Sequence, residues 1–143
     1  TGVCVALARE IARDGEGATR LIEVTVRGAR DEGDARRAAR TVAASNLVKA
    51  AVHGADANWG RILAALGRSG AAFDPSQVSV RLGGLVLVAG GCGAAFDEAE
   101  ARSLLQRDEV RLVIDLGAGT AEATAWGCDL TADYVKINAS YRS

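Results

Sequence analysis

The chain has 143 residues, of which 49% are apolar and 24% are charged, and its formal net charge is −1. This length and apolar content predict one domain, residues 1–143, with a core of its own. The charge balance shows no basic excess that would indicate nucleic-acid binding, and no apolar run approaches the roughly 20 residues that a membrane-spanning helix needs.

The sulfur and imidazole side chains are few. Three cysteines (Cys4, Cys92 and Cys128) and one histidine (His53) are present, which argues against a disulfide framework and against a protein zinc site. No signal-peptide pattern is visible, and we therefore expect a cytoplasmic protein. The chain also contains no Met, so we expect a processed or excerpted chain.

The first third of the chain predicts a helix, a strand and a second helix. Apolar residues recur at helical spacing over 3–13, and Gly15 and Gly17 end that pattern. Apolar and polar residues alternate over 21–27, which predicts a strand with one solvated face. Asp34 is the expected N-cap of the next helix, whose buried face would consist largely of alanine.

The middle of the chain predicts a short apolar segment that ends at Gly54, followed by a helix capped by Asp56 or Asn58. Pro75 marks a turn, and strands are expected over 77–82 and 85–91.

The last third begins with a helix over 98–106, for which Asp97 and Glu100 are spaced as a capping box. Two strands follow, joined by Gly117–Thr120 in what we expect to be a hairpin, and one helical turn is expected after Thr131. The fold class is therefore α+β, with helices packed on a mixed sheet.

Glu16 is the most unusual candidate for chemistry. It lies between two glycines, which let a backbone approach a ligand closely. A carboxylate in that position could pair with a substrate amine, whereas the simpler interpretation is a solvated acid on a helix-ending turn. Residue types alone favour the simpler interpretation.

Other candidates are weaker. The loops at 90–93 and 117–120 are rich in glycine but complete neither a phosphate-binding nor a dinucleotide-binding motif. Nothing in the spacing supports Cys92 with His53 as a nucleophile and base. Thr1 could be an N-terminal nucleophile whose α-amine acts as base, although any excerpted chain must begin somewhere.

Three runs together are far more specific: RDGEGATR (13–20), GADANWGRILAALGRSG (54–70) and TAWGCDLTADYVKINASYRS (124–143). Their sequence and order resemble the ornithine acetyltransferase family, whose members are also called glutamate N-acetyltransferases. FDEAEA (96–101) lies between them, and the resemblance covers essentially the whole chain.

The resemblance implies a layered α/β/β/α fold and a precursor that cleaves itself before a threonine. The α and β chains would stay together, with two such pairs assembling. The new terminal threonine would take an acetyl group from N-acetylornithine and pass it to glutamate, in a ping-pong reaction of arginine biosynthesis. No cofactor is expected, although acetyl-CoA serves some members as donor.

Residue by residue, the resemblance assigns substrate binding to Glu16, Asn138 and Ser143. Glu16 matches the glutamate of the DGEG motif, Asn138 the asparagine of the KINA run, and Ser143 the terminal hydroxyl residue after Tyr-Arg. Ser140 is a departure, because many relatives carry Asp there. Asp56, Asn58 and Trp59 belong to a family signature that we interpret as structural.

The same comparison argues against Thr1 as the nucleophile. In the family the nucleophilic threonine stands well upstream of DGEGAT, and residues 2–11 resemble the helix just before that motif. We therefore expect this chain to be the C-terminal part of the β chain, without a catalytic residue of its own.

Two alternatives stay open: an N-terminal-nucleophile aminopeptidase of the same fold group, and a non-catalytic binding module.

Overall fold

The computed structural model describes residues 2–13 and 19–130. In this part of the chain, six strands form one mixed sheet in the order β4-β3-β2-β5-β1-β6. Their bounds are β1 Leu21–Ala29, β2 Ser79–Leu82, β3 Leu85–Ala89, β4 Cys92–Gly93, β5 Glu109–Asp115 and β6 Ala121–Cys128. The expected α+β class is confirmed.

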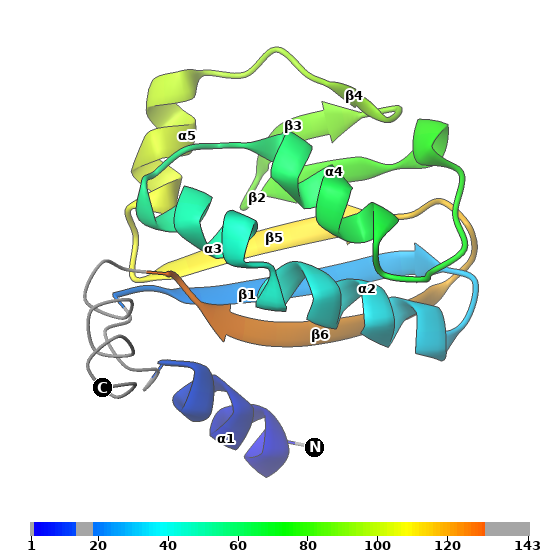
Figure 1. Cartoon of the computed structure of the whole chain (residues 1–143), viewed down its shortest axis with the longest axis horizontal. Helices are drawn as coiled ribbons and strands as arrows, with labels where there is room; N and C mark the ends of the chain where they lie inside the picture. Colours follow the sequence, from blue (N-terminus) through cyan, green and yellow to red (C-terminus); the bar gives the residue numbers. More distant parts are fainter. Residues whose placement is uncertain (1, 14–18, 131–143) are drawn as a thin grey trace, which may run out of the picture.

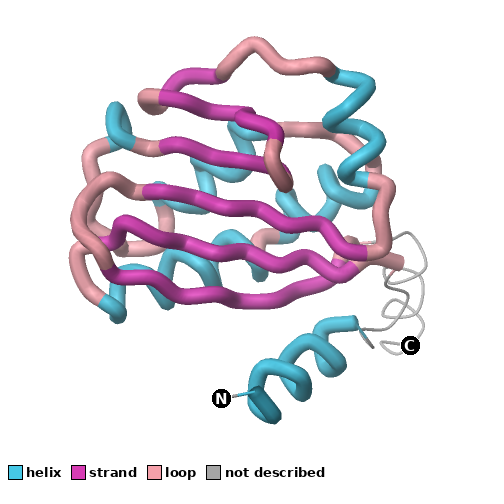
Figure 2. Tube along the Cα trace, turned by 180° about the vertical axis from the view of Figure 1, so that it is seen from behind, coloured by secondary structure: helices cyan, strands magenta, loops and turns pink. Residues whose placement is uncertain are grey.

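Helices cover one face of this sheet (Figure 1). Their bounds are α2 Glu32–Ala44, α3 Asn46–His53, α4 Trp59–Gly67 and α5 Glu98–Leu105, and a 3-10 turn spans Pro75–Gln77. Seen from behind, the opposite face of the sheet has none of these helices across it (Figure 2). These four helices therefore form one layer on one face of the sheet.

The core lies between the sheet and the helices, as the strand alternation predicts. Ile22, Val24 and Val26 of β1 are fully buried, whereas Arg27 on the other face is exposed. The alanine face of α2 is also buried. Small side chains let this helix approach β1 and β6 closely, and apolar burial of this kind is the main stabilising term in folding.

Helix α1, Gly2–Arg13, confirms the first expected helix, but it stands apart from the core. None of its residues is buried, and Val3, Leu7 and Ile11 are exposed. Arg9 and Arg13 both donate hydrogen bonds to Glu109 of β5. Burial raises the pKa of Glu109, but its pairing with Arg9 and Arg111 outweighs this effect and holds the pKa below its usual value.

The N-cap of α2 corrects one prediction. Asp31, not Asp34, caps the helix: its backbone is extended and its carboxylate accepts from the Asp34 amide, 2.7 Å away. Asp34 lies in the first turn, where its buried carboxylate accepts from Arg37 and from the Ala72 amide. Both aspartates suit a helix start: Asp31 accepts the amide of the first turn, whereas Asp34 binds Arg37 and the distant Ala72 amide.

The other caps agree with the sequence. Asn58 caps α4, with its side chain accepting from the Arg61 amide, and Asp97 caps α5 by accepting from Ala99 and Glu100. Trp59 packs against the core, close to Gly93 of β4.

The expected hairpin between β5 and β6 is wrong. Both strands exist, but β1 lies between them, parallel to β5 and antiparallel to β6. The loop over 117–120 crosses the end of β1, where the amides of Ala118 and Gly119 both donate to the Gly28 carbonyl. A glycine-rich turn between two strands fits a crossover as well as a hairpin.

Candidate functional site

The three predicted substrate contacts, Glu16, Asn138 and Ser143, lie outside the described residues, as do Thr1 and the turn expected after Thr131. Their roles stay predictions. The structure does describe the residues that flank both segments, and these flanks meet.

The meeting point follows from strand register. Leu21, the first residue of β1, pairs with Cys128, the last residue of β6. Because the two strands are antiparallel, the residues just before β1 and just after β6 lie side by side. The ladder continues one step further through the Asp129 amide, which donates to the Arg20 carbonyl at 3.2 Å.

Asp129 is the centre of this junction. Its carboxylate is fully buried and accepts from the Thr19 and Arg20 amides, both at 2.8 Å, and from the Thr19 hydroxyl at 2.5 Å. His53 Nδ1 lies 2.9 Å from the same carboxylate. We call Thr19, Arg20, His53 and Asp129 the Asp129 cluster.

These donors keep the carboxylate ionised. Burial raises the pKa of Asp129, but hydrogen bonds from Thr19, Arg20 and His53 together outweigh it and hold the pKa below its usual value. A buried carboxylate without such donors would carry a large desolvation cost.

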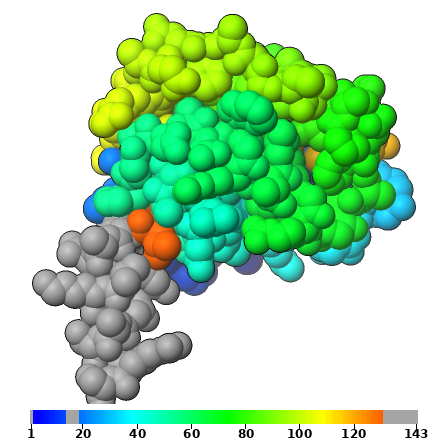
Figure 3. Space-filling view, turned by 45° about the horizontal axis from the view of Figure 1, so that its top comes forward, coloured from blue at the N-terminus to red at the C-terminus, as the bar shows by residue number. Residues whose placement is uncertain are grey.

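The cluster also holds the end of α3. The Arg20 guanidinium donates to the carbonyls of Val52 at 3.1 Å and His53 at 2.9 Å, which places a cation at the negative end of the helix dipole. The Leu130 amide donates to the Lys49 carbonyl. Figure 3 shows the end of the β6 segment (orange) lying against the α3 surface (teal).

A pocket of about 230 Å³ opens beside the cluster, and its described lining is Arg13, Thr19, Arg20, Leu21 and Asp108. Arg13 donates to Glu109, and Arg20 donates to the carbonyls at the end of α3, so both guanidinium groups of this lining already have partners.

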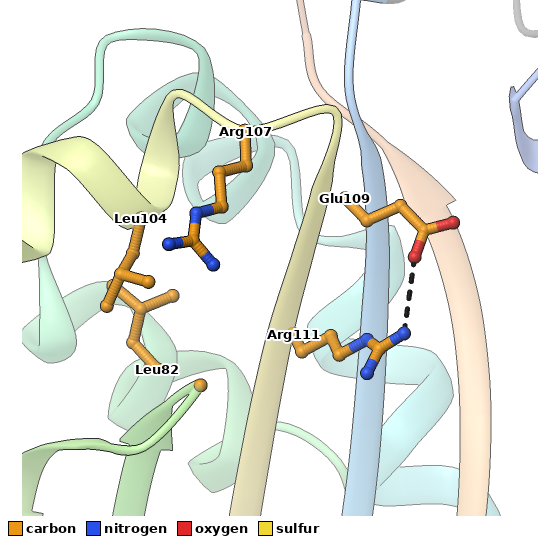
Figure 4. Close-up of a pocket in the computed structure, with 6 residues that line it drawn as sticks. Leu82, Leu104, Arg107, Glu109 and Arg111 are labelled. Atoms are coloured by element: carbon orange, nitrogen blue, oxygen red, sulfur yellow. Dashed lines mark hydrogen bonds and ion pairs between the residues drawn. The ribbon is translucent and has the colours of Figure 1, made fainter.

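A second pocket, of about 430 Å³, lies near the start of β5 and includes Leu82, Leu104, Arg107, Glu109 and Arg111 in its lining. Figure 4 shows Arg107 beside Leu104, whereas Arg111 reaches toward Glu109. Arg111 is paired with Glu109 at 3.4 Å and Glu23 at 3.6 Å, so its charge is already balanced. None of the predicted site residues belongs to the described lining.

Within residues 2–13 and 19–130, no group of three or more His, Cys, Asp or Glu side chains is arranged to hold a metal ion. No helix in these ranges has the length and apolar character needed to span a bilayer.

The sequence pattern gave no role to Asp129 and indicated His53 only as an unsupported partner for Cys92. His53 ends α3 and is partly exposed, and its ring contacts Asp129. The available signal was the position of Asp129 inside the GCDLTADYVKINA run. An isolated aspartate at a strand end gives no sign of its burial, so the residue pattern alone could not single it out.

The fold and the junction define a helix-covered mixed-sheet domain in which two distant segments meet at a buried carboxylate. The chain belongs to the ArgJ family, whose model matches residues 1–143. This finding confirms the resemblance seen in the sequence.

Individual relatives agree. The chain is 64% identical over 141 residues to the arginine biosynthesis bifunctional protein ArgJ of Symbiobacterium thermophilum, covering 99% of this chain and 35% of that protein. It is 54% identical over 140 residues to the protein of the same name from Geobacillus kaustophilus, covering 98% and 34%. The chain thus spans about a third of the length of these curated relatives.

A solved structure shares the fold. The crystal structure of the arginine biosynthesis bifunctional protein argJ from Bacillus halodurans superposes with a TM-score of 0.94 at 46% sequence identity. The match covers 97% of this chain and 66% of that one.

Proposed function

We propose that this chain is the C-terminal part of the β chain of a self-cleaving acetyltransferase of arginine biosynthesis. The full protein would move an acetyl group from N-acetylornithine to glutamate, releasing ornithine and N-acetylglutamate. Membership of the ArgJ family is the observation that carries this proposal; the names of the relatives support the pathway.

The reaction would proceed in two half-reactions. The hydroxyl of an N-terminal threonine upstream of this chain attacks the acetyl carbonyl of N-acetylornithine, and the C–N bond breaks as the leaving amine takes a proton. The amine of glutamate then attacks the threonine ester, forming N-acetylglutamate and restoring the hydroxyl. The α-amine of that threonine is the base for its own hydroxyl.

This chain would supply substrate contacts. The Glu16 carboxylate suits an ammonium group, while the Asn138 amide and the Ser143 hydroxyl suit a carboxylate or amide through hydrogen bonds. The meeting of the two flanks at Asp129 supports a composite site, because it brings residue 19 and residue 129 into direct contact.

The proposed function also implies partner chains and a cellular location. The α chain of the same precursor would remain bound, two αβ pairs would assemble, and the enzyme would work in the cytoplasm without a cofactor. An assay of the full-length protein with acetyl-CoA and glutamate tests whether acetyl-CoA also acts as a donor.

The test supplies N-acetylornithine and glutamate to the full-length protein and follows both products. Equal amounts of ornithine and N-acetylglutamate are expected. Peptide hydrolysis without acetyl transfer would reject this function in favour of an aminopeptidase, and the lack of self-cleavage and of both activities would favour a binding module.

A further inference from the structure

We propose that Asp129 is a positioning residue for acetyl transfer: through Thr19 and Arg20 its buried carboxylate fixes where the substrate-binding segments leave the sheet. The inference deepens the proposed function and rests on it. Asp129 does not itself contact substrate in this proposal.

The first argument is the direction of the contacts. One carboxylate oxygen, Oδ1, accepts from the amides of Thr19 and Arg20, both at 2.8 Å. The other, Oδ2, accepts from the Thr19 hydroxyl and faces His53 Nδ1. Two consecutive amides bound to one oxygen fix the path of the backbone, not only its distance from β6.

The second argument is location. The β1–β6 ladder pairs Leu21 with Cys128. The Asp129 contacts join the two chain segments beyond the end of this ladder. Thr19 is three residues from Glu16, and three residues of chain span at most about 11 Å. The position of Thr19 therefore limits where Glu16 can lie. Asp129 also begins the run that leads to Asn138 and Ser143.

The third argument is energetic. A fully buried ionised carboxylate is an expensive way to stabilise a fold, because desolvation offsets much of what its partners contribute. Its geometric effect is different: donors from the two residues before β1 and from the last residue of α3 converge on one carboxylate and restrict its orientation. Positional precision of this kind matters for transfer between two bound amino acids, because a misplacement of about 1 Å can cost about a hundredfold in rate.

The experiment compares Asp129→Ala, Asp129→Asn, Thr19→Val and Thr19→Ser in the full-length protein. Asp129→Asn keeps a carbonyl oxygen for the two amides, and Thr19→Ser keeps the hydroxyl. Asp34→Asn is the matched control, because Asp34 is an equally buried carboxylate that accepts from Arg37 and Ala72 at the start of α2. For each variant, kcat and KM for N-acetylornithine are measured beside the thermal midpoint and the extent of self-cleavage.

The expected result is a fall in kcat/KM of about tenfold or more for Asp129→Ala, with smaller falls for Asp129→Asn and Thr19→Val. Thr19→Ser, which keeps the hydroxyl, should have a kcat/KM close to that of the wild type. Asp34→Asn should lower the thermal midpoint while kcat/KM of the folded enzyme stays within about twofold of wild type. If Asp129→Ala does not fold, Asp129→Asn and Thr19→Val decide, and values within about twofold of wild type in both overturn the proposal.

Amide exchange at Thr19 and Arg20 separates this inference from the proposed function. If the wild-type protein shows no acetyl transfer, the proposed function is rejected, and amide exchange then tests only the contacts of Asp129 with Thr19 and Arg20. Exchange of these two amides at least about tenfold faster in Asp129→Ala and Thr19→Val than in Asp34→Asn supports the hold on the backbone. Equal exchange in all variants overturns it.

Discussion

Gly127 of β6 and Ala43 of α2 lie in direct contact, so close that a Cβ added at Gly127 would lie 2.5 Å from the Ala43 carbonyl oxygen. Real Cβ atoms do not approach backbone oxygens to that distance. The spacing between α2 and the sheet is therefore set at this point by the lack of a side chain.

Gly127→Ala should destabilise the protein, because α2 or β6 must move to admit the methyl group. Overpacking of this kind costs about 1–3 kcal/mol. Denaturant unfolding of the full-length protein measures the loss, and Gly84→Ala is the control because a Cβ there has open space. Equal midpoints for the two variants would contradict the close contact.

Asn58→Ala should weaken the start of α4, because the Asn58 side chain accepts from the Arg61 amide at 3.2 Å. Loss of such a cap costs about 1 kcal/mol. Asn58→Asp keeps an acceptor and should leave the thermal midpoint nearly unchanged. A substantial loss of kcat/KM in folded Asn58→Ala would instead assign this residue to the substrate site.

Stability at acid pH should depend on Asp34. The amide of Ala72 in the first place, and Arg30 and Arg37 as well, hold the pKa of Asp34 below its usual value, although burial opposes them. The unfolded chain, with an Asp pKa of about 3.9, binds this proton more readily. The contribution is therefore complete well above that value and is lost as pH falls through the lower folded pKa.

Thermal midpoints of wild type and Asp34→Asn, measured from neutral pH downwards, test this prediction. The difference between them should be constant near neutrality and should shrink as the pH falls below about 4. A difference that stays the same throughout would show that the Asp34 charge contributes nothing.

Glu16→Ala in the full-length protein should raise KM for N-acetylornithine by about tenfold or more, the usual effect of losing a hydrogen bond to a charged group. Self-cleavage should persist. Glu98→Ala, at an exposed position in the first turn of α5, is the matched control. Failure of both cleavage and folding in Glu16→Ala alone would make Glu16 structural.

Local patterns predicted the elements well, because their causes are local. The alternation over β1 reflects one buried and one solvated face, and Asn58 and Asp97 cap helices through contacts within three residues. The contact of the buried Asp34 carboxylate with Ala72 and the place of β1 between β5 and β6 depend on segments far apart in the chain. No short stretch of sequence predicts either of them.

The candidate site likewise has one part that the sequence predicts and one part that it does not. Glu16 came from a motif whose resemblance to a family supplied what spacing could not. Asp129 belongs to one of the three family runs, but the sequence gives no sign of its role, because its donors come from Thr19, Arg20 and His53, which are far away in the sequence. Only the folded chain brings these four residues together.

The order of strands also bears on biosynthesis at the ribosome. Within this chain, strand β1 is made before both of its neighbours in the sheet, β5 and β6. Until then its two edges have no partner, and unpaired strand edges are sites of aggregation. A nascent chain with this strand order must therefore keep the edges of β1 from pairing wrongly until β5 and β6 have been made.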